Sequence, residues 1–450
     1  MILVDENDLF RMNKNKELTP EILQEFIAYN EQMAEDRYQP LIDAYRNKYE
    51  IFKLPKKQDG KPDNRVAVNF AKYITDTMNG FFIGNPIKIS TDDADVKAYV
   101  EMENAYNMQD DKDAELSKQA DIFGKGYEMY YVDDDGHICT VNNTPLEAFM
   151  IYDDSVVPEP LYFVRYYKDA DNKTVGSFSS RTHIRYFEKD SSIKFLDEEK
   201  PHGFQYVPAS ELVENEERIG LFESAMSLIN AFNKALSEKA NDVDYFADAY
   251  MKIIGPSVDE SVSANLRKDR IVNIPTENPA GIVCDFMEKP NADTTQENLI
   301  DRLEKLIFTT TMVANINDEN FGTTSGIALR YRLQSMSNLA NVKKRKFTAL
   351  LNNRYKIIFS NPVSTVNRND WMKLRFDFSF NYPANLAEEV DIASKMVGIT
   401  SEETRLSIIS AVDDVAEEKR KMQTEQDKTS YMTDYPTERT ESGLLEQAED

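Results

Sequence analysis

The chain has 450 residues, of which 41% are hydrophobic and 11% aromatic, so it can bury two or three cores and is not intrinsically disordered. No apolar run approaches the roughly 18–20 residues that a membrane span needs, and residues 1–6 lack the basic flank and long apolar region of a signal peptide. Cys139 and Cys284 are far apart and form no CxxC motif, which argues against a disulfide scaffold or a structural zinc site. We therefore expect a cytoplasmic protein without a membrane segment.

The charge is strongly acidic, with 53 Lys and Arg against 79 Asp and Glu and a formal net charge of −26. Tight binding of nucleic acid normally requires a basic patch that releases counterions from phosphate. The overall charge argues against such binding, although a local patch stays open. An acidic surface would suit a protein past which DNA slides without sticking. Plain solubility explains the same charge, and charge alone favours this second interpretation.

The N-terminal region is predicted to be helical. Thr19, Pro20 and Glu21 form a helix start, with a capping threonine, a proline at the first helical position and an acid in the first turn. Pro40 is expected to break or kink this segment. A further helix is predicted over 70–81 from its apolar spacing, ending at the glycines 80 and 84.

From about residue 126 the pattern changes to that of strands. Residues 127–132 and 137–141 alternate around the sequence DDDG at 133–136, which is typical of a hairpin turn. Two more strands are expected at 161–167 and 183–187, with a turn between them at 176–180. The region as a whole, up to about residue 213, is predicted to be a mixed, mainly antiparallel sheet structure.

A long helix is predicted over 221–250, where apolar residues recur every three or four positions. Thirty helical residues would span about 45 Å, which is long for a globular domain. Three short strands are expected after it, at 251–254, 270–274 and 282–286. Because so small a sheet buries little surface by itself, we expect it to pack against copies of itself or a partner.

A second helix is predicted to begin at Thr294, whose spacing to Glu297 fits a capping box. Its apolar stripe is predicted to contain Leu299, Leu303 and Leu306. The remaining elements are a polar loop at 315–326, a helix at 325–359, a strand at 374–380, two helices at 386–397 and 400–422, and a disordered acidic tail.

No constellation of residues points to catalysis. His137, His183 and His202 form no HxxxH or HxH pair, so structural or surface roles are favoured, and no GxSxG motif is present. The DDDG sequence at 133–136 lacks the spacing of a calcium loop, because its glycine is at the fourth position and Thr144 is at the twelfth. We expect no catalytic residue, no cofactor and no metal.

Two local sequences could suggest binding of phosphate or nucleic acid. The glycine-rich stretch 322–326 precedes a helix, but Ile327 rather than lysine follows the second glycine, so a P-loop is rejected and a flexible loop is favoured. The basic run 343–346 would wrap a full helical turn instead of forming one stripe. A solvated turn or a subunit contact is therefore favoured over contact with nucleic acid.

Several strings in a fixed order resemble the siphovirus-type portal proteins of tailed bacteriophages. These strings are VNFAKYI at 68–74, GFFIGNP at 80–86, FGKGYE at 123–128, HGFQYVP at 202–208, NDVDYFADAY at 241–250 and TSGIALRY at 324–331. The last is similar to the SGxAL segment that opens the helix after the tunnel loop of this family. Together they cover about residues 17–420.

The resemblance implies a helix-rich α+β portal fold and a ring, usually of twelve subunits, at one vertex of the capsid. Its parts would be a wing (1–215 and 327–387), stem helices (216–250 and 296–316), a clip (251–295), a tunnel loop (317–326), a crown (388–422) and a disordered acidic tail (423–450). Such a ring serves genome packaging, head–tail joining and DNA ejection. It would be assembled in the cytoplasm of the bacterial host and would remain in the virion.

The resemblance also implies the residues that meet the partners. Those of the tunnel loop, which touches the double-stranded DNA, are Asn317, Asp318, Glu319, Asn320, Phe321, Gly322, Thr323 and Thr324. Those of the clip, which docks the terminase motor and later the head-completion adaptor, are Arg270, Val272, Ile274, Val283 and Phe286. The major capsid and scaffolding proteins are further expected partners. The chain would not be an enzyme, so a partner must supply the packaging energy.

Two alternatives stay open at this point. Another head protein, such as a minor head or scaffolding protein, would share the location, but a scaffold would be more helical and lack the strand-rich region. A metal-dependent nuclease would need a clustered acidic site, and none is recognisable among the many acids of the sequence.

Overall fold

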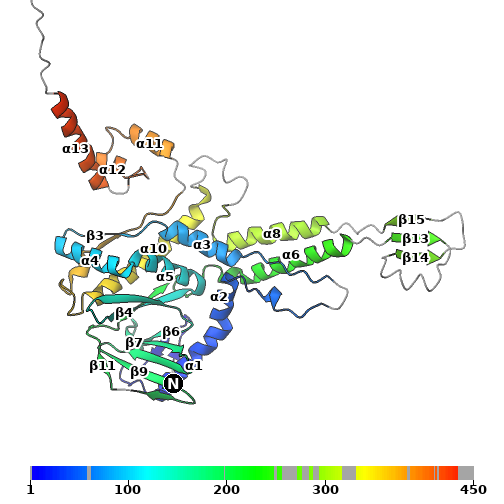
Figure 1. Cartoon of the computed structure of the whole chain (residues 1–450), viewed down its shortest axis with the longest axis horizontal. Helices are drawn as coiled ribbons and strands as arrows, with labels where there is room; N and C mark the ends of the chain where they lie inside the picture. The colour runs from blue at the N-terminus through cyan, green and yellow to red at the C-terminus, as the bar shows by residue number, and fades with distance from the viewer. Residues whose placement is uncertain are drawn as a thin grey trace, which may run out of the picture. The chain divides into compact units, whose positions relative to one another are not determined.

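The computed structural model of the chain describes residues 3–57, 62–196, 198–247, 251–255, 271–275, 283–286, 293–316, 331–382, 386–409, 411–412 and 415–433. The chain divides into two compact units, Met1–Phe321 with Tyr331–Asn381, and Gly322–Arg330 with Tyr382–Asp450. The first unit combines helices with mainly antiparallel sheets, whereas the elements described in the second are helices (Figure 1). The predicted helix-rich α+β class is confirmed. No described helix is long and apolar enough to cross a membrane.

Helix α1 (Pro20–Met33) begins where its sequence predicts. Thr19 is the N-cap, and its hydroxyl accepts a hydrogen bond from the third amide of the helix at 3.4 Å. Pro40 produces an irregularity instead of a break. A π-helical segment (Ala34–Tyr38) joins α1 to α2 (Gln39–Tyr45), and Pro40 is at the start of α2, where a missing amide proton costs little.

Helix α3 (Phe70–Ile83) confirms the next prediction, except that Gly80 lies within the helix, which ends at Gly84. Two helices that apolar spacing did not reveal follow it, α4 (Ala94–Asn107) and α5 (Gln109–Phe123). The polar side chains that α5 buries are those of Gln109, Asp113, Ser117 and Asp121. Because this face of α5 is polar, the helix lacks the apolar stripe on which the sequence-based prediction relies.

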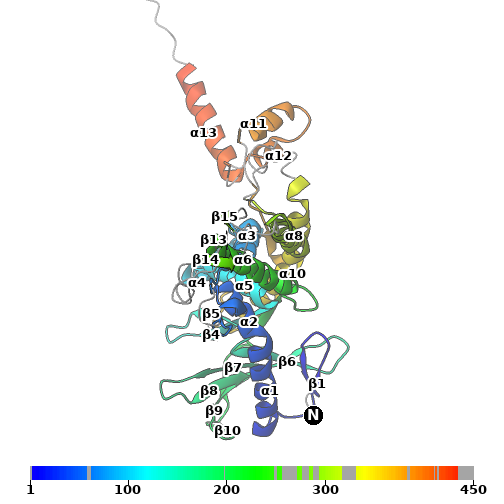
Figure 2. The ribbon, with the colours of Figure 1, turned by 90° about the vertical axis from the view of Figure 1, so that its right-hand side faces the viewer.

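The large sheet has the strand order β1-β2-β6-β7-β8-β9-β10, with β11 paired to β9. All of its pairs are antiparallel except β2–β6, which is parallel. The strands are β1 (Leu3–Val4), β2 (Phe10–Met12), β6 (Ala148–Asp153), β7 (Pro160–Lys168), β8 (Thr174–Ser179), β9 (His183–Lys189), β10 (Ile193–Phe195) and β11 (Lys200–Pro201). Helix α1 lies beside this sheet (Figure 2), and its Phe26 packs on Phe10 of β2 with ring centroids 5.7 Å apart.

The turn predicted at 176–180 is wrong, because these residues form most of strand β8. Gly176 pairs with Tyr166 on one side and Phe187 on the other. A Cβ atom at this position would lie 2.5 Å from the ring of Phe187 and 2.4 Å from the carbonyl oxygen of Arg165. The glycine therefore marks a close approach within the sheet.

A second sheet has the order β12-β4-β5. Its strands are β4 (Lys125–Val132), β5 (Ile138–Asn143) and β12 (Ala209–Val213). The predicted hairpin is confirmed, because Val132 pairs with Ile138 and Gly136 has a φ of +85°. The carboxylate of Asp133 accepts hydrogen bonds from the amides of Asp135 (3.1 Å) and His137 (2.8 Å), so this acid stabilises the turn.

Helix α10 (Gln334–Ile358) is the long helix predicted near the C-terminal end of the first unit, and the part predicted before residue 331 lies outside the described residues. The strand predicted at 374–380 is shorter, because only β16 (Arg375–Asp377) pairs with β3 (Lys88–Ser90). Phe378 continues beyond the strand and stacks on Phe82 of α3, with ring centroids 5.5 Å apart.

Helices α6 (Met226–Ala247) and α8 (Asp293–Thr311) lie side by side (Figure 1). Helix α6 begins after a 3-10 turn (Glu223–Ala225), five residues later than predicted. At 1.5 Å per residue, its described length is about 33 Å. The buried stripe of α8 is formed by Ile300, Leu303 and Ile307, so the predicted stripe is wrong at Leu299 and Leu306, which are exposed.

The three short strands after α6 are confirmed as β13 (Met251–Gly255), β14 (Ile271–Pro275) and β15 (Val283–Phe286). The central strand β13 pairs with β14 in parallel and with β15 in antiparallel orientation.

The described part of the second unit contains α11 (Leu386–Lys395), α12 (Glu402–Leu406) and α13 (Val415–Thr433). The single helix predicted at 400–422 is wrong, because α12 and α13 are separate. Ser401 instead of Thr400 caps α12, accepting a hydrogen bond from the Thr404 amide at 3.2 Å. The tail predicted to be disordered from residue 423 is helical as far as Thr433.

Candidate functional site

The helix pair α6–α8 has an apolar interior face. Ile229 and Phe232 of α6 are buried, as are Ile300, Leu303 and Ile307 of α8. Two polar contacts join the C-terminal part of α6 to the N-terminal part of α8. Gln296 Nε2 donates to Asp242 Oδ2 at 2.9 Å, and Lys239 forms an ion pair with Glu297. The two helices therefore form one rigid rod over the length that the structure describes.

Aromatic contacts attach the N-terminal part of α6 and the C-terminal part of α8 to α3. The ring of Phe70 lies edge-on to Phe232 of α6 at 4.9 Å and to Phe308 of α8 at 5.8 Å. Tyr73, one turn further along α3, contacts Phe308 at 5.7 Å, and its hydroxyl accepts a hydrogen bond from the Ile316 amide at 2.9 Å. Side chains of α3 thus contact both helices at once.

A polar ladder on α6 binds the extended segment before α3. Asn233, Ser237 and Asn241 follow one another at intervals of four residues, so they lie on one face, and all three are buried. Their side-chain oxygens accept hydrogen bonds from the backbone amides of Val68 (2.9 Å), Val66 (2.9 Å) and Asn64 (2.6 Å). Sequence analysis missed this ladder, although an Asn-Ser-Asn repeat at intervals of four residues was a visible signal.

The segment that leads into α6, including its 3-10 turn, is joined to the π-helical segment and to α5. Arg37 Nε donates to Glu223 Oε1 at 2.6 Å, and Arg37 Nη2 donates to the carbonyl oxygen of Arg218 at 2.6 Å. The Leu221 amide donates to the carbonyl oxygen of Asp121 at 2.7 Å. The base of the rod is therefore fixed by hydrogen bonds in addition to packing.

Within the basic run 343–346, Lys343 departs from the solvated turn that the sequence favoured, whereas Arg345 is exposed. Lys343 is buried, and its ammonium donates to Asp121 of α5 and, at 3.0 Å, to Glu214 after β12. Burial raises the pKa of Asp121; Lys343 opposes this rise, and Glu214 adds to it. The sequence could not reveal this burial, because the two carboxylates are 222 and 129 residues away along the chain.

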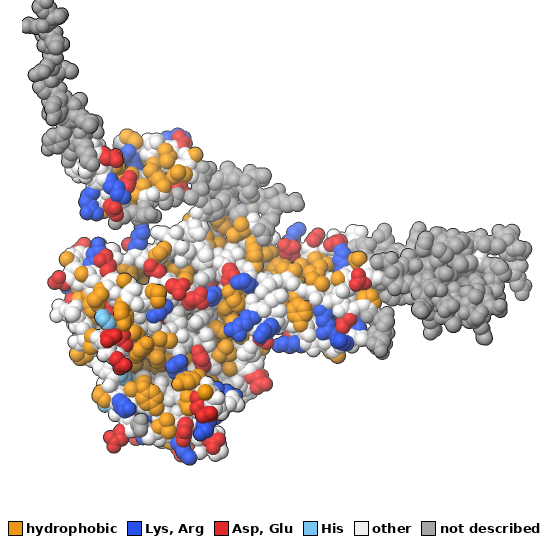
Figure 3. All heavy atoms as spheres, viewed as in Figure 1, with side chains coloured by type: hydrophobic (Ala, Val, Ile, Leu, Met, Phe, Trp, Pro, Cys, Tyr) orange, Lys and Arg blue, Asp and Glu red, His pale blue; other side chains and the backbone are white. Residues whose placement is uncertain are grey.

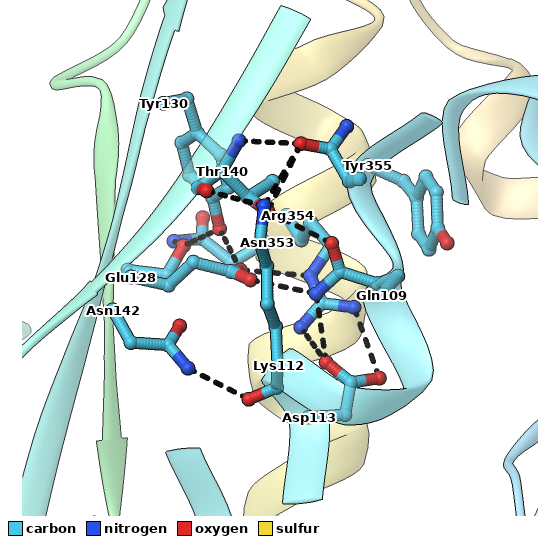
Figure 4. Close-up of polar contacts among 12 residues, drawn as sticks. Gln109, Lys112, Asp113, Glu128, Tyr130, Thr140, Asn142, Asn353, Arg354 and Tyr355 are labelled. Atoms are coloured by element: carbon cyan, nitrogen blue, oxygen red, sulfur yellow. Dashed lines mark hydrogen bonds and ion pairs between the residues drawn. The ribbon is translucent and has the colours of Figure 1, made fainter. Parts of the chain in front are cut away.

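A second buried cation on α10, Arg354, is surrounded by polar groups (Figure 4). Its guanidinium donates to Glu128 Oε2 at 2.8 Å and to both carboxylate oxygens of Asp113. Glu128 also accepts hydrogen bonds from Gln109 (2.9 Å) and from the Tyr130 hydroxyl (2.8 Å). Burial lowers the pKa of Arg354, but Asp113 and Glu128 more than compensate and raise it overall. The network joins α10, α5 and β4.

A third buried ion pair joins Arg218 to Glu211 of β12, with Arg218 Nη2 2.9 Å from Glu211 Oε2. The Tyr152 hydroxyl donates to the same oxygen at 2.7 Å. Burial would raise the pKa of Glu211, but Arg218 and the hydrogen bonds outweigh it and lower this pKa to about 2. Glu211 is therefore ionised at neutral pH.

The predicted tunnel-loop residues, Asn317 to Thr324, lie outside the described residues. The structure describes what precedes them: α8 ends at Thr311, and Asn315 Nδ2 donates to Glu304 Oε1 at 3.0 Å. Their predicted contact with DNA stays a prediction.

Four of the five predicted clip residues lie on the small sheet. Val272 and Ile274 belong to β14, where they pair with Lys252 and Ile254 of β13. Two more, Val283 and Phe286, begin and end β15, and Arg270 lies outside the described residues. The strands bring these positions onto one sheet, and their side chains are not among the described ones.

The histidines give no support to a metal or catalytic site. The ring of His137 stacks on Tyr106 at 4.2 Å, and burial lowers the pKa of His202, which favours its neutral form. No group of three potential metal-ligating side chains occurs within the described ranges.

The chain is similar to known proteins over most of its length. Residues 24–431 match the family described as "Phage portal protein, SPP1 Gp6-like". A portal protein of Clostridium phage phiCD119 is 21% identical over 424 residues, covering 85% of this chain and 91% of the relative. A portal protein of Bacillus phage SPP1 is 22% identical over 400 residues, covering 83% and 78%. A solved structure titled "Neck of empty GTA particle computed with C6 symmetry" is 13% identical, with a TM-score of 0.42 over 75% of this chain and 89% of that one.

Both of these phage relatives are named portal proteins. The chain belongs to the SPP1 Gp6-like family of phage portal proteins. It is therefore a portal subunit, as its sequence strings predicted, and the alternatives of a scaffolding protein or a nuclease are not supported.

Proposed function

We propose that copies of this chain close into a ring whose channel passes double-stranded DNA at one vertex of the capsid. In this proposal the ring has twelve subunits, is assembled in the bacterial cytoplasm, contacts the major capsid and scaffolding proteins, and stays in the virion for packaging, head–tail joining and ejection. The energy for packaging comes from a separate terminase motor, because the portal subunit itself has no enzymatic role.

The main support for a ring is an apolar stripe on α8 that remains exposed to solvent in the single chain. Leu299 is 51% exposed and Leu306 is 38% exposed. They are seven residues apart, hence nearly on the same side of the helix, and apolar side chains gather over α8 in Figure 3. Exposed apolar stripes of this kind mark interaction surfaces. A neighbouring copy would cover the stripe in a ring.

This interface is tested by Leu299→Asp with Leu306→Asp, examined by mass measurement and electron microscopy. The double variant should keep its circular dichroism but lose rings, because a charge on each residue would be buried between subunits. Asn298→Asp, one residue away on a polar part of α8, is the matched control and should still form rings. A wild-type protein that stays monomeric at every concentration, without rings, would overturn the proposal.

In the same proposal α6 and α8 are the stem, the sheet β14-β13-β15 is the clip, residues 1–215 and 327–387 are the wing, and residues 388–422 are the crown. The clip docks the motor and the adaptor. This assignment is supported by a small sheet whose outer strands, β14 and β15, each pair with only one strand of the described chain. Val272→Asp with Ile274→Asp should weaken docking while the wing stays folded; unchanged docking and assembly would exclude this location.

Residues 317–326 are proposed to form the loop that contacts DNA in the channel. The segment contains no Lys or Arg, so it would touch DNA without holding its phosphates. Deleting residues 318–323 should spare ring assembly and impair packaging or retention of DNA. Normal packaging by intact rings of this variant would refute the assignment.

A further inference from the structure

A pocket of about 250 Å³ lies in the first unit, away from the helix pair α6–α8, where α10 meets the loops that precede β9 and β12. Arg181 comes from the β8–β9 turn, Tyr206 from the segment before β12, and Asn353 and Lys356 from the last two turns of α10. Glu159 also lines the pocket. Four sections of the chain therefore contribute to one pocket.

Three cations surround the ring of Tyr206. Lys356 Nζ lies 4.6 Å from the ring centroid, and the guanidinium carbons of Arg181 and Arg368 each lie 5.6 Å from it. Arg368 comes from the segment between α10 and β16 and also donates from Nη2 to the Tyr206 hydroxyl at 2.9 Å. An aromatic ring attracts cations, but three like charges around one ring also repel each other.

These cations differ from the two buried cations of α10, Lys343 and Arg354, in having no carboxylate partner. Within the described ranges, Arg181, Lys356 and Arg368 form no ion pair. Lys343 and Arg354, on the same helix as Lys356, each contact two carboxylates. In a chain with a net charge of −26, three unpaired cations around one ring are a local excess of positive charge. Arg181 and Lys356 line the pocket together with Glu159, and Arg368 lies beside the ring of Tyr206.

Hydrogen bonds around the pocket hold two of the cations in place. Other donor nitrogens of the cations have no acceptor within the described chain. Arg181 Nε donates to the carbonyl oxygen of Gln205 at 2.8 Å, and Arg368 Nη1 donates to the side-chain oxygen of Gln205. Lys356 Nζ makes no hydrogen bond to the described chain, and the terminal nitrogens of Arg181 likewise have no acceptor there. The Tyr206 hydroxyl accepts from Arg368, so its own proton remains available.

We propose that this pocket binds a phosphate-type oxyanion. From the pocket lining, Lys356 supplies a point charge, Arg181 supplies planar guanidinium donors and the Tyr206 hydroxyl supplies one more, a donor set that matches tetrahedral phosphate oxygens. Arg368 adds positive charge beside the Tyr206 ring. The source is either free inorganic phosphate or a backbone phosphate of duplex DNA. Only the DNA source rests on the proposed portal function, since the free anion needs neither a ring nor a genome.

The test titrates inorganic phosphate into the full chain by calorimetry. Arg181→Gln and Lys356→Gln should each weaken binding about tenfold or more, since each removes a charge-assisted contact from the pocket lining. The matched control is Arg345→Gln, an exposed arginine of α10 far from the pocket, and it should bind phosphate as the wild type does. As a check that needs no substitution, saturating phosphate should protect the Lys356 amine of the wild type from acetylation.

A parallel titration with duplex DNA distinguishes the two sources. If DNA uses the pocket, it should compete with phosphate, and Lys356→Gln should lower the salt dependence of DNA binding by about one phosphate contact. If phosphate alone binds, the free anion is the ligand. The proposal is overturned if phosphate does not bind, if the control weakens it as much as the pocket variants do, or if an acidic peptide displaces it and binds more tightly. Because the phosphate titration does not depend on rings, its failure is distinguishable from failure of the portal proposal.

Discussion

Arg354 and Glu128 are both buried, and Arg354 Nε donates to Glu128 Oε2 at 2.8 Å. The two residues are 226 positions apart in the chain, and their contact joins α10 to β4. Asp113 of α5 completes the group around the guanidinium. Such a buried pair is strongly destabilising to break, because the charge left behind cannot regain its hydration.

Arg354→Met should therefore lower the free energy of unfolding by roughly 3–5 kcal/mol, since it leaves two carboxylates buried without their cation. Urea denaturation followed by tryptophan fluorescence and circular dichroism measures this loss. Arg345→Met, on the same helix but exposed, is the control and should change stability by less than about 0.5 kcal/mol. Adding Asp113→Asn and Glu128→Gln to Arg354→Met should restore part of the loss. A single variant as stable as the wild type would contradict this account.

The ion pair of Glu211 and Arg218 predicts a defined dependence of stability on pH. The pKa of Glu211 is lowered to about 2 from an ordinary value of 4.5. Its stabilising contribution, about 3 kcal/mol, is complete above pH 4.5 and is lost as the pH falls towards 2. Glu211→Gln should destabilise the protein at pH 7, and its difference from the wild type should shrink across this window. A difference that is constant from pH 7 to pH 2 would refute the prediction.

The polar ladder on α6 predicts a local effect on the segment before α3. Ser237→Ala removes the acceptor for the Val66 amide and the donor to the Val66 carbonyl, at a cost of about 1–3 kcal/mol. Hydrogen exchange should accelerate at Val66 more than at amides of the β4–β5 hairpin. Ser227→Ala, an exposed serine on the same helix, is the matched control and should leave exchange unchanged. Equal exchange in both variants would show that the ladder does not hold this segment.

Alanine substitutions at two glycines should change the stability of the protein in opposite directions. Gly176→Ala should destabilise the large sheet by about 1–3 kcal/mol, because the new methyl group would collide with the Phe187 ring and the Arg165 carbonyl. Gly80→Ala should stabilise α3 by about 0.4–1 kcal/mol, because the position is helical and no atom lies within 4 Å of the added carbon. Thermal unfolding of both variants measures the contrast. If Gly176→Ala does not lower the midpoint, the packing around Gly176 is not as described; if Gly80→Ala lowers it, the prediction for α3 is wrong.

Local rules predicted the elements whose causes are local. The cap of α1 needs only Thr19 and Pro20, and the β4–β5 turn needs only Asp133 and Gly136, so both could be located from the sequence. The three short strands were equally clear, because proline and glycine separate them. The portal family was recognisable from short strings, such as those at the two ends of α3.

Other features depended on residues distant in the chain. Helix α5 was missed because Asp113 and Asp121 occupy positions where an amphipathic helix would have apolar residues. They are stabilised there by Arg354 and Lys343, more than two hundred residues away. The same distance explains why the basic run at 343–346 looked solvated.

The sequence by itself determined the class of the fold, the family, and the positions of most helices and of the three short strands, because caps, turns and apolar spacing act over a few residues. Only the tertiary structure decided which face of α8 is covered, why Gly176 lies in a strand, and which cations are neutralised. A buried charge or a close contact is stable only when its partner is present. Here those partners are supplied by folding, so the paired Lys343 and the unpaired Lys356 cannot be distinguished along the chain.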